Sequence, residues 1–136
     1  MSLASQIDTL ATRIASEIKA IRTFQEVFSI PGTLVVATGV SRLLMPRAGT
    51  VTNVWASINT APTGASAIFD VNKNGTTIFT TQSARPTIAV STNSDATSTP
   101  AVTSFSAGDY FTVDVDQIGS TVAGSNAVIG IEFKFT

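Results

Sequence analysis

The segment NAVIGIEFKF, residues 126–135, decides the fold class of this chain. Its odd-numbered positions are all apolar, from Ala127 to Phe135, whereas the even-numbered positions include Glu132 and Lys134. Successive side chains of a β-strand point to opposite faces of the sheet. The segment therefore predicts a strand with one buried face and one face nearer to water.

The preceding segments continue this pattern. In YFTVDVDQ, residues 110–117, Phe111, Val113 and Val115 face one way and the polar residues between them face the other. Asn74-Gly75 predicts a tight hairpin, because both residues tolerate the positive φ of a type I′ turn. The expected strands are Thr33–Thr38, Ser41–Met45, Thr50–Asn59, Ala65–Asn72, Thr76–Thr81, Thr87–Ser91, Ala101–Phe105, Tyr110–Gln117 and Asn126–Phe135. Short strands at this spacing predict a mainly β fold, a jelly-roll-like antiparallel β-sandwich.

The N-terminal part of the chain has a different period. Its aliphatic residues recur in steps of three or four, which trace one stripe along an amphipathic helix. The expected oligomerisation residues are Leu3, Ile7, Leu10, Ile14, Ile18 and Ile21. Ser2 or Ser5 is expected to cap the start of this helix, and Lys19 and Arg22 lie in its last turns, where the helix dipole favours cations.

The aliphatic stripe needs a partner surface. An isolated helix of about 20 residues is marginal in water, so its apolar face must be covered to stabilise it. The helix either folds back onto its own β-domain or forms a parallel bundle with copies of itself, and we expect the bundle. Isoleucine at one heptad position with leucine at the other favours two helices. The repeat is short and imperfect, because Glu17 stands where an apolar residue belongs, so it does not decide the number of helices.

Proline and glycine divide the chain in two. Pro31-Gly32 follows a bridging stretch at residues 24–29, and proline cannot continue a helix. We expect residues 1–26 to form the oligomerisation helix and residues 27–136 the β-sandwich domain.

Composition excludes several classes of function. Hydrophobic residues make up 43% of the chain and charged residues only 12%, with a net charge of −1 and scattered basic residues. Nucleic-acid binding is not expected, because no cationic stripe can neutralise a phosphate backbone. No signal peptide or membrane-spanning segment is expected either. A charge-poor surface rich in hydroxyl groups suits β-structure that packs against copies of itself.

The absence of cysteine and histidine limits the available chemistry. Their absence excludes Ser-His-Asp catalysis, thiolate chemistry and the usual zinc sites. We therefore expect no enzyme, no cofactor and no bound metal. Asp114 and Asp116 share a strand face at a spacing that glycosidases use, but a solvated face is the commoner explanation. The segment Asp70–Gly75 matches the opening of an EF-hand calcium loop, yet its twelfth position is Thr81. A hairpin explains the same residues, and the sequence does not decide whether calcium binds there.

Two aromatic residues are candidates for ligand binding. Trp55 and Tyr110 are the only residues of their kinds, and an exposed indole or phenol beside carboxylates suits stacking of a sugar ring. Packing in the core or between subunits is the alternative for both. The candidate ligand-binding residues are Trp55, Tyr110, Asp114 and Asp116.

Several segments carry a resemblance to a known family. They are Leu3 to Ile14, Glu17 to Lys19 and Arg22-Thr23 in the helix, and Ala48 to Val51, Thr60 to Gly64, Asp70 to Gly75, Arg85-Pro86 and Ala107 to Ser120 in the β-part. The helical segment resembles one that recurs in minor tail proteins of phages infecting actinobacteria, and the β-part resembles a sandwich module of phage structural proteins. The resemblance implies a homotrimeric virion component whose helices bundle along a three-fold axis. The chain is shorter than long-fibre proteins, which favours a compact tip, an adaptor or a head decoration.

These observations lead to three functional hypotheses. The first is a trimeric tail-associated protein, a minor tail, tip or receptor-binding module, with other virion proteins and a host cell-surface glycan as partners. The second is a capsid decoration or head-fibre protein, which the same plan would serve. The third is a carbohydrate-binding module, or a carboxylate hydrolase, built on Tyr110, Asp114 and Asp116.

Overall fold

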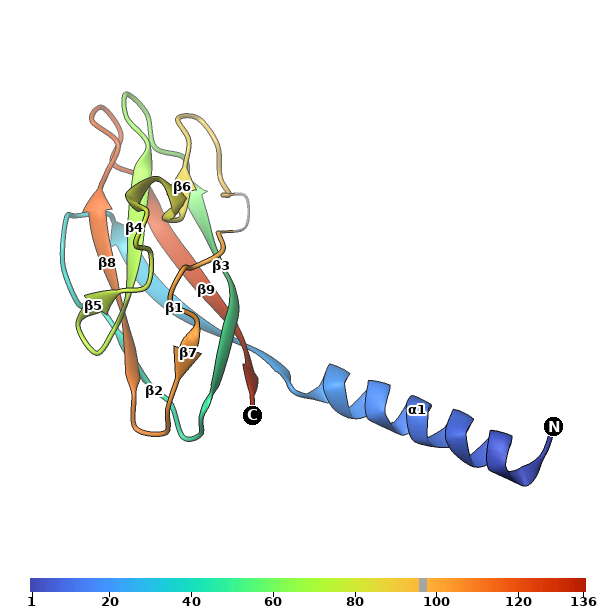
Figure 1. Cartoon of the computed structure of the whole chain (residues 1–136). Helices are drawn as coiled ribbons and strands as arrows, with labels where there is room; N and C mark the ends of the chain where they lie inside the picture. The colour runs from blue at the N-terminus through green and yellow to red at the C-terminus, as the bar shows by residue number, and fades with distance from the viewer. Residues whose placement is uncertain (96–97) are drawn as a thin grey trace.

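The protein consists of one N-terminal helix joined to a β-domain of two antiparallel sheets. The computed structural model describes residues 1–95 and 98–136 of the 136-residue chain. The elements are α1 (Leu3–Ile21), β1 (Thr23–Thr33), β2 (Arg42–Leu44), β3 (Gly49–Thr60), β4 (Ala67–Lys73), β5 (Thr76–Thr77), the 3-10 helix η1 (Gln82–Ala84), β6 (Thr87–Ile88), β7 (Ser104–Phe105), β8 (Tyr110–Gln117) and β9 (Ser125–Phe135). Figure 1 shows the helix projecting away from the β-domain. The expected mainly β fold with an N-terminal helix is confirmed.

The chain passes back and forth between the two sheets. The first sheet has the strand order β1-β9-β3-β7, and the second has the order β2-β8-β4-β5, with β6 also paired to β4. β9 is central to the first sheet and pairs along most of its length with β1 and β3. Each sheet therefore holds strands that are distant in sequence, and the faces that they turn toward each other enclose the core.

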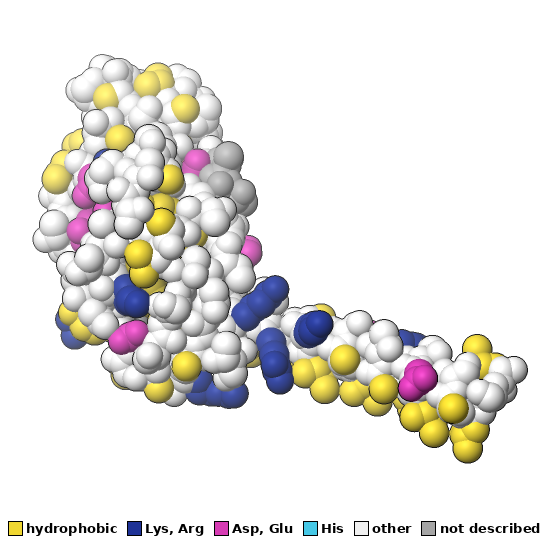
Figure 2. Space-filling model, viewed as in Figure 1, with side chains coloured by type: hydrophobic (Ala, Val, Ile, Leu, Met, Phe, Trp, Pro, Cys, Tyr) yellow, Lys and Arg dark blue, Asp and Glu magenta, His cyan; other side chains and the backbone are white. Residues whose placement is uncertain are grey.

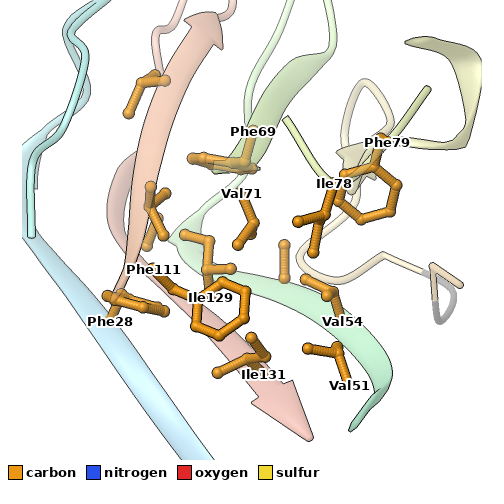
Figure 3. Close-up of a cluster of buried hydrophobic side chains, with 14 of the residues drawn as sticks. Phe28, Val51, Val54, Phe69, Val71, Ile78, Phe79, Phe111, Ile129 and Ile131 are labelled. Carbon is orange, nitrogen blue, oxygen red and sulfur yellow. The ribbon is translucent and has the colours of Figure 1, made fainter. Parts of the chain in front are cut away.

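The inward faces follow the alternation that the sequence predicts. In β9, Ile129 and Ile131 are fully buried, and in β8, Phe111 and Val113 are fully buried. Figure 3 shows side chains of both sheets meeting in one cluster, with Phe69 on β4 close to Val71. This cluster is the only large apolar core that the described residues form. Burying an aliphatic or aromatic side chain stabilises the fold by about 1.5–3 kcal/mol each.

The segment after the helix differs from the expectation. Residues 24–29 are not a bridge, because β1 begins at Thr23 and pairs with β9 from Thr23 opposite Lys134. Pro31-Gly32 lies at the end of this strand, where the register with β9 shifts between Ile30 and Thr33. β1 is an edge strand, and proline is tolerated there because no neighbour needs its missing N–H group.

The expected strand at Thr33–Thr38 is also wrong. This segment leaves the first sheet and crosses to the second, where only Ala37 forms an isolated bridge, to Val115 of β8. The Val40 N–H donates to the Val113 carbonyl oxygen over 2.9 Å. The three strands expected between β4 and Tyr110 exist but are shorter than predicted, because β5, β6 and β7 each span two residues. The segment at 34–41 thus covers one edge of the second sheet.

The predicted hairpin is confirmed. Asn74 (φ 52°) and Gly75 (φ 84°) connect β4 to β5 with the two positive φ values that such a turn requires. Asn74 Oδ1 accepts a hydrogen bond from the Tyr110 N–H over 3.0 Å. The turn is therefore fixed to the start of β8.

Candidate functional site

The helix α1 carries the first candidate site, which is an assembly surface. Ser2 precedes it with extended backbone, and its Oγ accepts a hydrogen bond from the Ser5 N–H over 3.2 Å. Lys19 lies in the last turn, where its positive charge interacts favourably with the negative end of the helix dipole. The predicted capping by Ser2 is confirmed, and these local features define where the helix begins and ends.

The six aliphatic residues of the helix form one exposed row. We call this the aliphatic row; its exposed fractions are Leu3 72%, Ile7 56%, Leu10 57%, Ile14 50%, Ile18 44% and Ile21 71%. Figure 2 shows hydrophobic side chains gathered along one side of the projecting helix. No residue of the helix is buried, so the β-domain of the same chain does not cover the row. The alternative in which the helix folds back is not the arrangement in this structure.

An aromatic residue shortly after the helix packs on the first sheet. Phe24, at the start of β1, is 42% exposed and stacks on Phe133, with 6.0 Å between the ring centroids. Its ring also contacts that of Phe135 at 5.1 Å. Arg22 alone separates the helix from β1, so the helix is joined directly to the strand that carries Phe24.

The second candidate site lies on the outer face of the second sheet. The positions of β4 and β8 that alternate with inward-facing Val71 and Val113 point away from the core, and apart from Ile68 and Tyr110 their side chains are Asp, Asn or Thr. Asn72 of β4 lies opposite Thr112 of β8, and both are more than nine-tenths buried although they face outward. The hollow at this position has a volume of about 390 Å³, and we call it the polar pocket. It is lined by Thr38, Gly39, Arg42, Asn72, Gly75, Tyr110, Thr112 and Asp114.

Asp114 organises one wall of the polar pocket. Its Oδ1 accepts a hydrogen bond from the Gly39 N–H over 2.7 Å, and its Oδ2 accepts one from Asn72 Nδ2 over 2.8 Å. These bonds connect β8 to β4 and to the segment that covers the edge of the sheet. The carboxylate is therefore held in one position beside the pocket.

Tyr110 and Arg42 form another part of the lining. The guanidinium carbon of Arg42 lies 3.9 Å from the centroid of the Tyr110 ring, which is a cation–π contact. Arg42 comes from β2 and lies opposite Thr112 in the sheet register. The aromatic ring thus has a cationic neighbour that the sequence did not predict.

The structure brings together only two of the four predicted ligand-binding residues. Tyr110 and Asp114 line the polar pocket, whereas Asp116 forms an ion pair with Arg85 and does not line it. Trp55 lies on the other sheet, over Gly130 of β9. Both carboxylates are engaged by protein donors, Asp114 by Gly39 and Asn72 and Asp116 by Arg85.

Four side chains of the polar pocket, Thr38, Arg42, Asn72 and Thr112, are not predicted from the sequence. Arg42, Asn72 and Thr112 come from three different strands, and only the pairing register places them side by side. Asn72 lies within the segment that matches the opening of a calcium loop, so its local pattern indicates a different chemistry. The one available signal is the outward position of the polar residues on the strand that carries Tyr110 and Asp114.

The side chains of the calcium-like segment have separate partners. Thr77 Oγ1 donates to Asp70 Oδ1 over 2.7 Å, Asn72 bonds to Asp114, and Asn74 Nδ2 donates to Asp109 Oδ1 over 2.8 Å. Within residues 1–95 and 98–136, no group of three or more acidic side chains is placed to hold a metal ion. The hairpin and these hydrogen bonds account for the conformation of the segment.

Two carboxylates near this hairpin have shifted pKa values. Burial raises the pKa of Asp70, although the hydrogen bond from Thr77 opposes the effect. Hydrogen bonds from the Ser106 N–H and from Asn74 lower the pKa of Asp109. Neither residue lines the polar pocket. The two pKa shifts therefore make the stability of the β-domain depend on pH.

A smaller hollow lies on the first sheet. It has a volume of about 280 Å³ and is lined by Ser29, Ile30, Pro31, Asn59, Asn126, Ala127 and Val128. None of these lining side chains is charged. The hollow therefore offers fewer groups for orienting a ligand than the polar pocket does.

The chain matches no protein-family model, no curated protein and no solved structure. Among the described residues, no helix combines the length and the apolar character needed to cross a membrane. The geometry of the aliphatic row and of the polar pocket therefore carries the functional proposals.

Proposed function

We propose that the protein is a homo-oligomeric structural component of a virion, a trimeric tail-associated module in which α1 is the assembly element. The observation that carries the proposal is the aliphatic row, whose six residues are between 44% and 72% exposed in the single chain. A helix of this length gains little stability alone. Copies of the same helix provide the matching apolar surface.

The width of the apolar face favours three helices over two. Besides the aliphatic row, Ala4 and Ala11 precede Ile18 at intervals of seven, so they extend the apolar face along one side of the row. A face of this width is covered more completely by two neighbouring helices than by one. Glu17 interrupts the seam, so we expect the β-domain to contribute to assembly as well.

The order of the strands supports a jelly-roll domain. The first four strands alternate between the two sheets, and the last two then return between them, with β9 between β1 and β3 and β8 between β2 and β4. Two interleaved antiparallel sheets of this kind are the plan of jelly rolls in viral capsid proteins. This plan and the resemblance of the helical segment to minor tail proteins favour a virion role.

The location in the virion can be tested with labelled particles. Gold-conjugated antibodies against the β-domain are expected to mark the tail or its tip on phage particles whose genome encodes this chain. Labelling of the capsid alone would replace the tail assignment by capsid decoration or head fibre. Absence of the chain from purified particles, checked by mass spectrometry, would contradict a virion role altogether.

A further inference from the structure

We infer that the polar pocket on the outer face of the second sheet binds a neutral saccharide ring. This inference goes beyond the proposed assembly role. The pocket is built from β2, β4, β8 and the segment before β2, whereas the aliphatic row lies on α1. The two proposals therefore succeed or fail independently.

The charges of the pocket select for a neutral ligand. Its lining includes one cation, Arg42, and one carboxylate, Asp114. The carboxylate opposes an anionic ligand, and the guanidinium opposes a cationic one. A divalent cation prefers several carboxylate or carbonyl oxygens, whereas Asp114 is the one carboxylate that lines the pocket. Opposite charges in one hollow instead suit hydroxyl groups, which both donate and accept hydrogen bonds.

Polar groups at the floor of the pocket have hydrogen-bonding capacity to spare. Every fully enclosed side-chain nitrogen or oxygen among the described residues has a partner. Thr112 is only 9% exposed and its hydroxyl bonds to no described residue, so that hydroxyl opens onto the pocket. Asn72 is 8% exposed and uses its Nδ2 to donate to Asp114, which leaves its Oδ1 as an acceptor. A ligand hydroxyl can supply the partner that each of these groups lacks.

The groups that would contact a sugar are already held in place. Gly39 and Asn72 fix both carboxylate oxygens of Asp114, and Arg42 lies against the ring of Tyr110. The planar guanidinium offers a rigid set of N–H donors, which matches neighbouring hydroxyls, and its contact with the Tyr110 ring helps to hold it in place. Groups fixed before binding lose little entropy when a ligand arrives.

The inference can be tested by NMR on the full-length, isotopically labelled protein. The probes are glucose, galactose, mannose, N-acetylglucosamine, arabinose and rhamnose, with sodium sulfate and N-acetylneuraminate as anionic counterparts. At least one neutral sugar is expected to shift the amide signals of Gly39 and Gly75 with a dissociation constant on the order of 1 mM. The indole N–H signal of Trp55, on the opposite sheet, is expected to stay unchanged.

Variants separate binding from structural effects. Thr112→Val keeps the shape of the side chain and removes a hydroxyl that makes no bond within the described protein, so it is expected to weaken sugar binding by about 3- to 10-fold without lowering the unfolding midpoint. Arg42→Leu changes an exposed side chain and is expected to weaken binding by about 10-fold or more. Thr52→Val, outside the pocket, is the matched control and is expected to leave the affinity unchanged.

Three results would overturn the inference. The first is that none of the six sugars shifts Gly39 or Gly75 at about fifty times that dissociation constant. The second is that the anions shift these signals and the sugars do not. The third is that sugar binding survives both Thr112→Val and Arg42→Leu at full affinity.

Discussion

The indole ring of Trp55 on β3 lies against Gly130 on β9. A Cβ atom placed at Gly130 would overlap Cε2 and Nε1 of that ring, closer than nonbonded atoms approach. The two residues are also direct partners in the register of the first sheet. The ring thus fills space that a side chain at Gly130 would need, which explains why the strand has glycine at an outward position.

Replacing this glycine is expected to displace the indole. In Gly130→Ala the ring must move toward solvent, because it is more mobile than the central strand that carries the new methyl group. We expect a loss of stability of about 1–3 kcal/mol and a shift of tryptophan emission to longer wavelength. Trp55 is the only tryptophan, so fluorescence reports this site directly. Val128→Ala, two residues away on the same strand, serves as the control, and an unchanged spectrum in Gly130→Ala would contradict the contact.

The core between the sheets is expected to depend on Phe69. This residue of β4 is fully buried within the central cluster (Figure 3). Phe69→Ala should lower the free energy of unfolding by about 3–5 kcal/mol, because it leaves a cavity and loses the transfer energy of the ring. Val36→Ala, at a position 63% exposed, should change it by less than about 0.5 kcal/mol. Equal effects of the two changes in urea denaturation would contradict the position of the core.

The raised pKa of Asp70 predicts a specific dependence of stability on pH. The folded state holds its proton more tightly than the unfolded state, whose value is 3.8. The contribution of this group is therefore present below 3.8 and lost as the pH rises through the higher folded-state pKa. Asp70→Asn avoids that loss and can still accept from Thr77. Its stability relative to the unmodified protein should increase over this pH range, and a difference independent of pH would contradict the shift.

Asp109 predicts the opposite dependence. Hydrogen bonds from Ser106 and Asn74 lower its folded-state pKa below 3.8, so its contribution is present above 3.8 and lost as the pH falls through the lowered value. Asp109→Ala should therefore be less stable than the unmodified protein at about pH 7, with a smaller difference at about pH 2. Urea midpoints at both values measure this. A difference that grows on acidification would exclude the proposed cause.

The local sequence pattern predicts some of the strands and misses others. β8 is predicted at its observed bounds, and β9 to within one residue, because each buries one face and alternates clearly. β1 is not predicted, since exposed Val27 and the Pro31-Gly32 pair obscure the alternation of Phe24, Phe28 and Ile30. The burial of Phe28 depends on pairing with a strand about a hundred residues later, which no local window contains.

The residues of the polar pocket are likewise predicted only in part. Tyr110 and Asp114 are predicted together because they share one face of one strand. Arg42 and Asn72 join them only through the pairing of β2 and β4 with β8. Asp116 shares the face as well, but Arg85 draws it into an ion pair away from the pocket. The pairing register of the strands determines which polar residues lie together in the pocket. That register could not be predicted from the sequence alone.

Sedimentation equilibrium of the full-length protein tests most directly whether the aliphatic row is an assembly surface. The unmodified chain should have a mass near three times 14.1 kDa. Ile14→Asp, within the row, should shift it toward the monomer, whereas Ser16→Asp, which places the same charge on the opposite side of the helix, should leave the mass unchanged. A folded monomer at all working concentrations, or an oligomer that Ile14→Asp does not disturb, would contradict the proposed role of the helix.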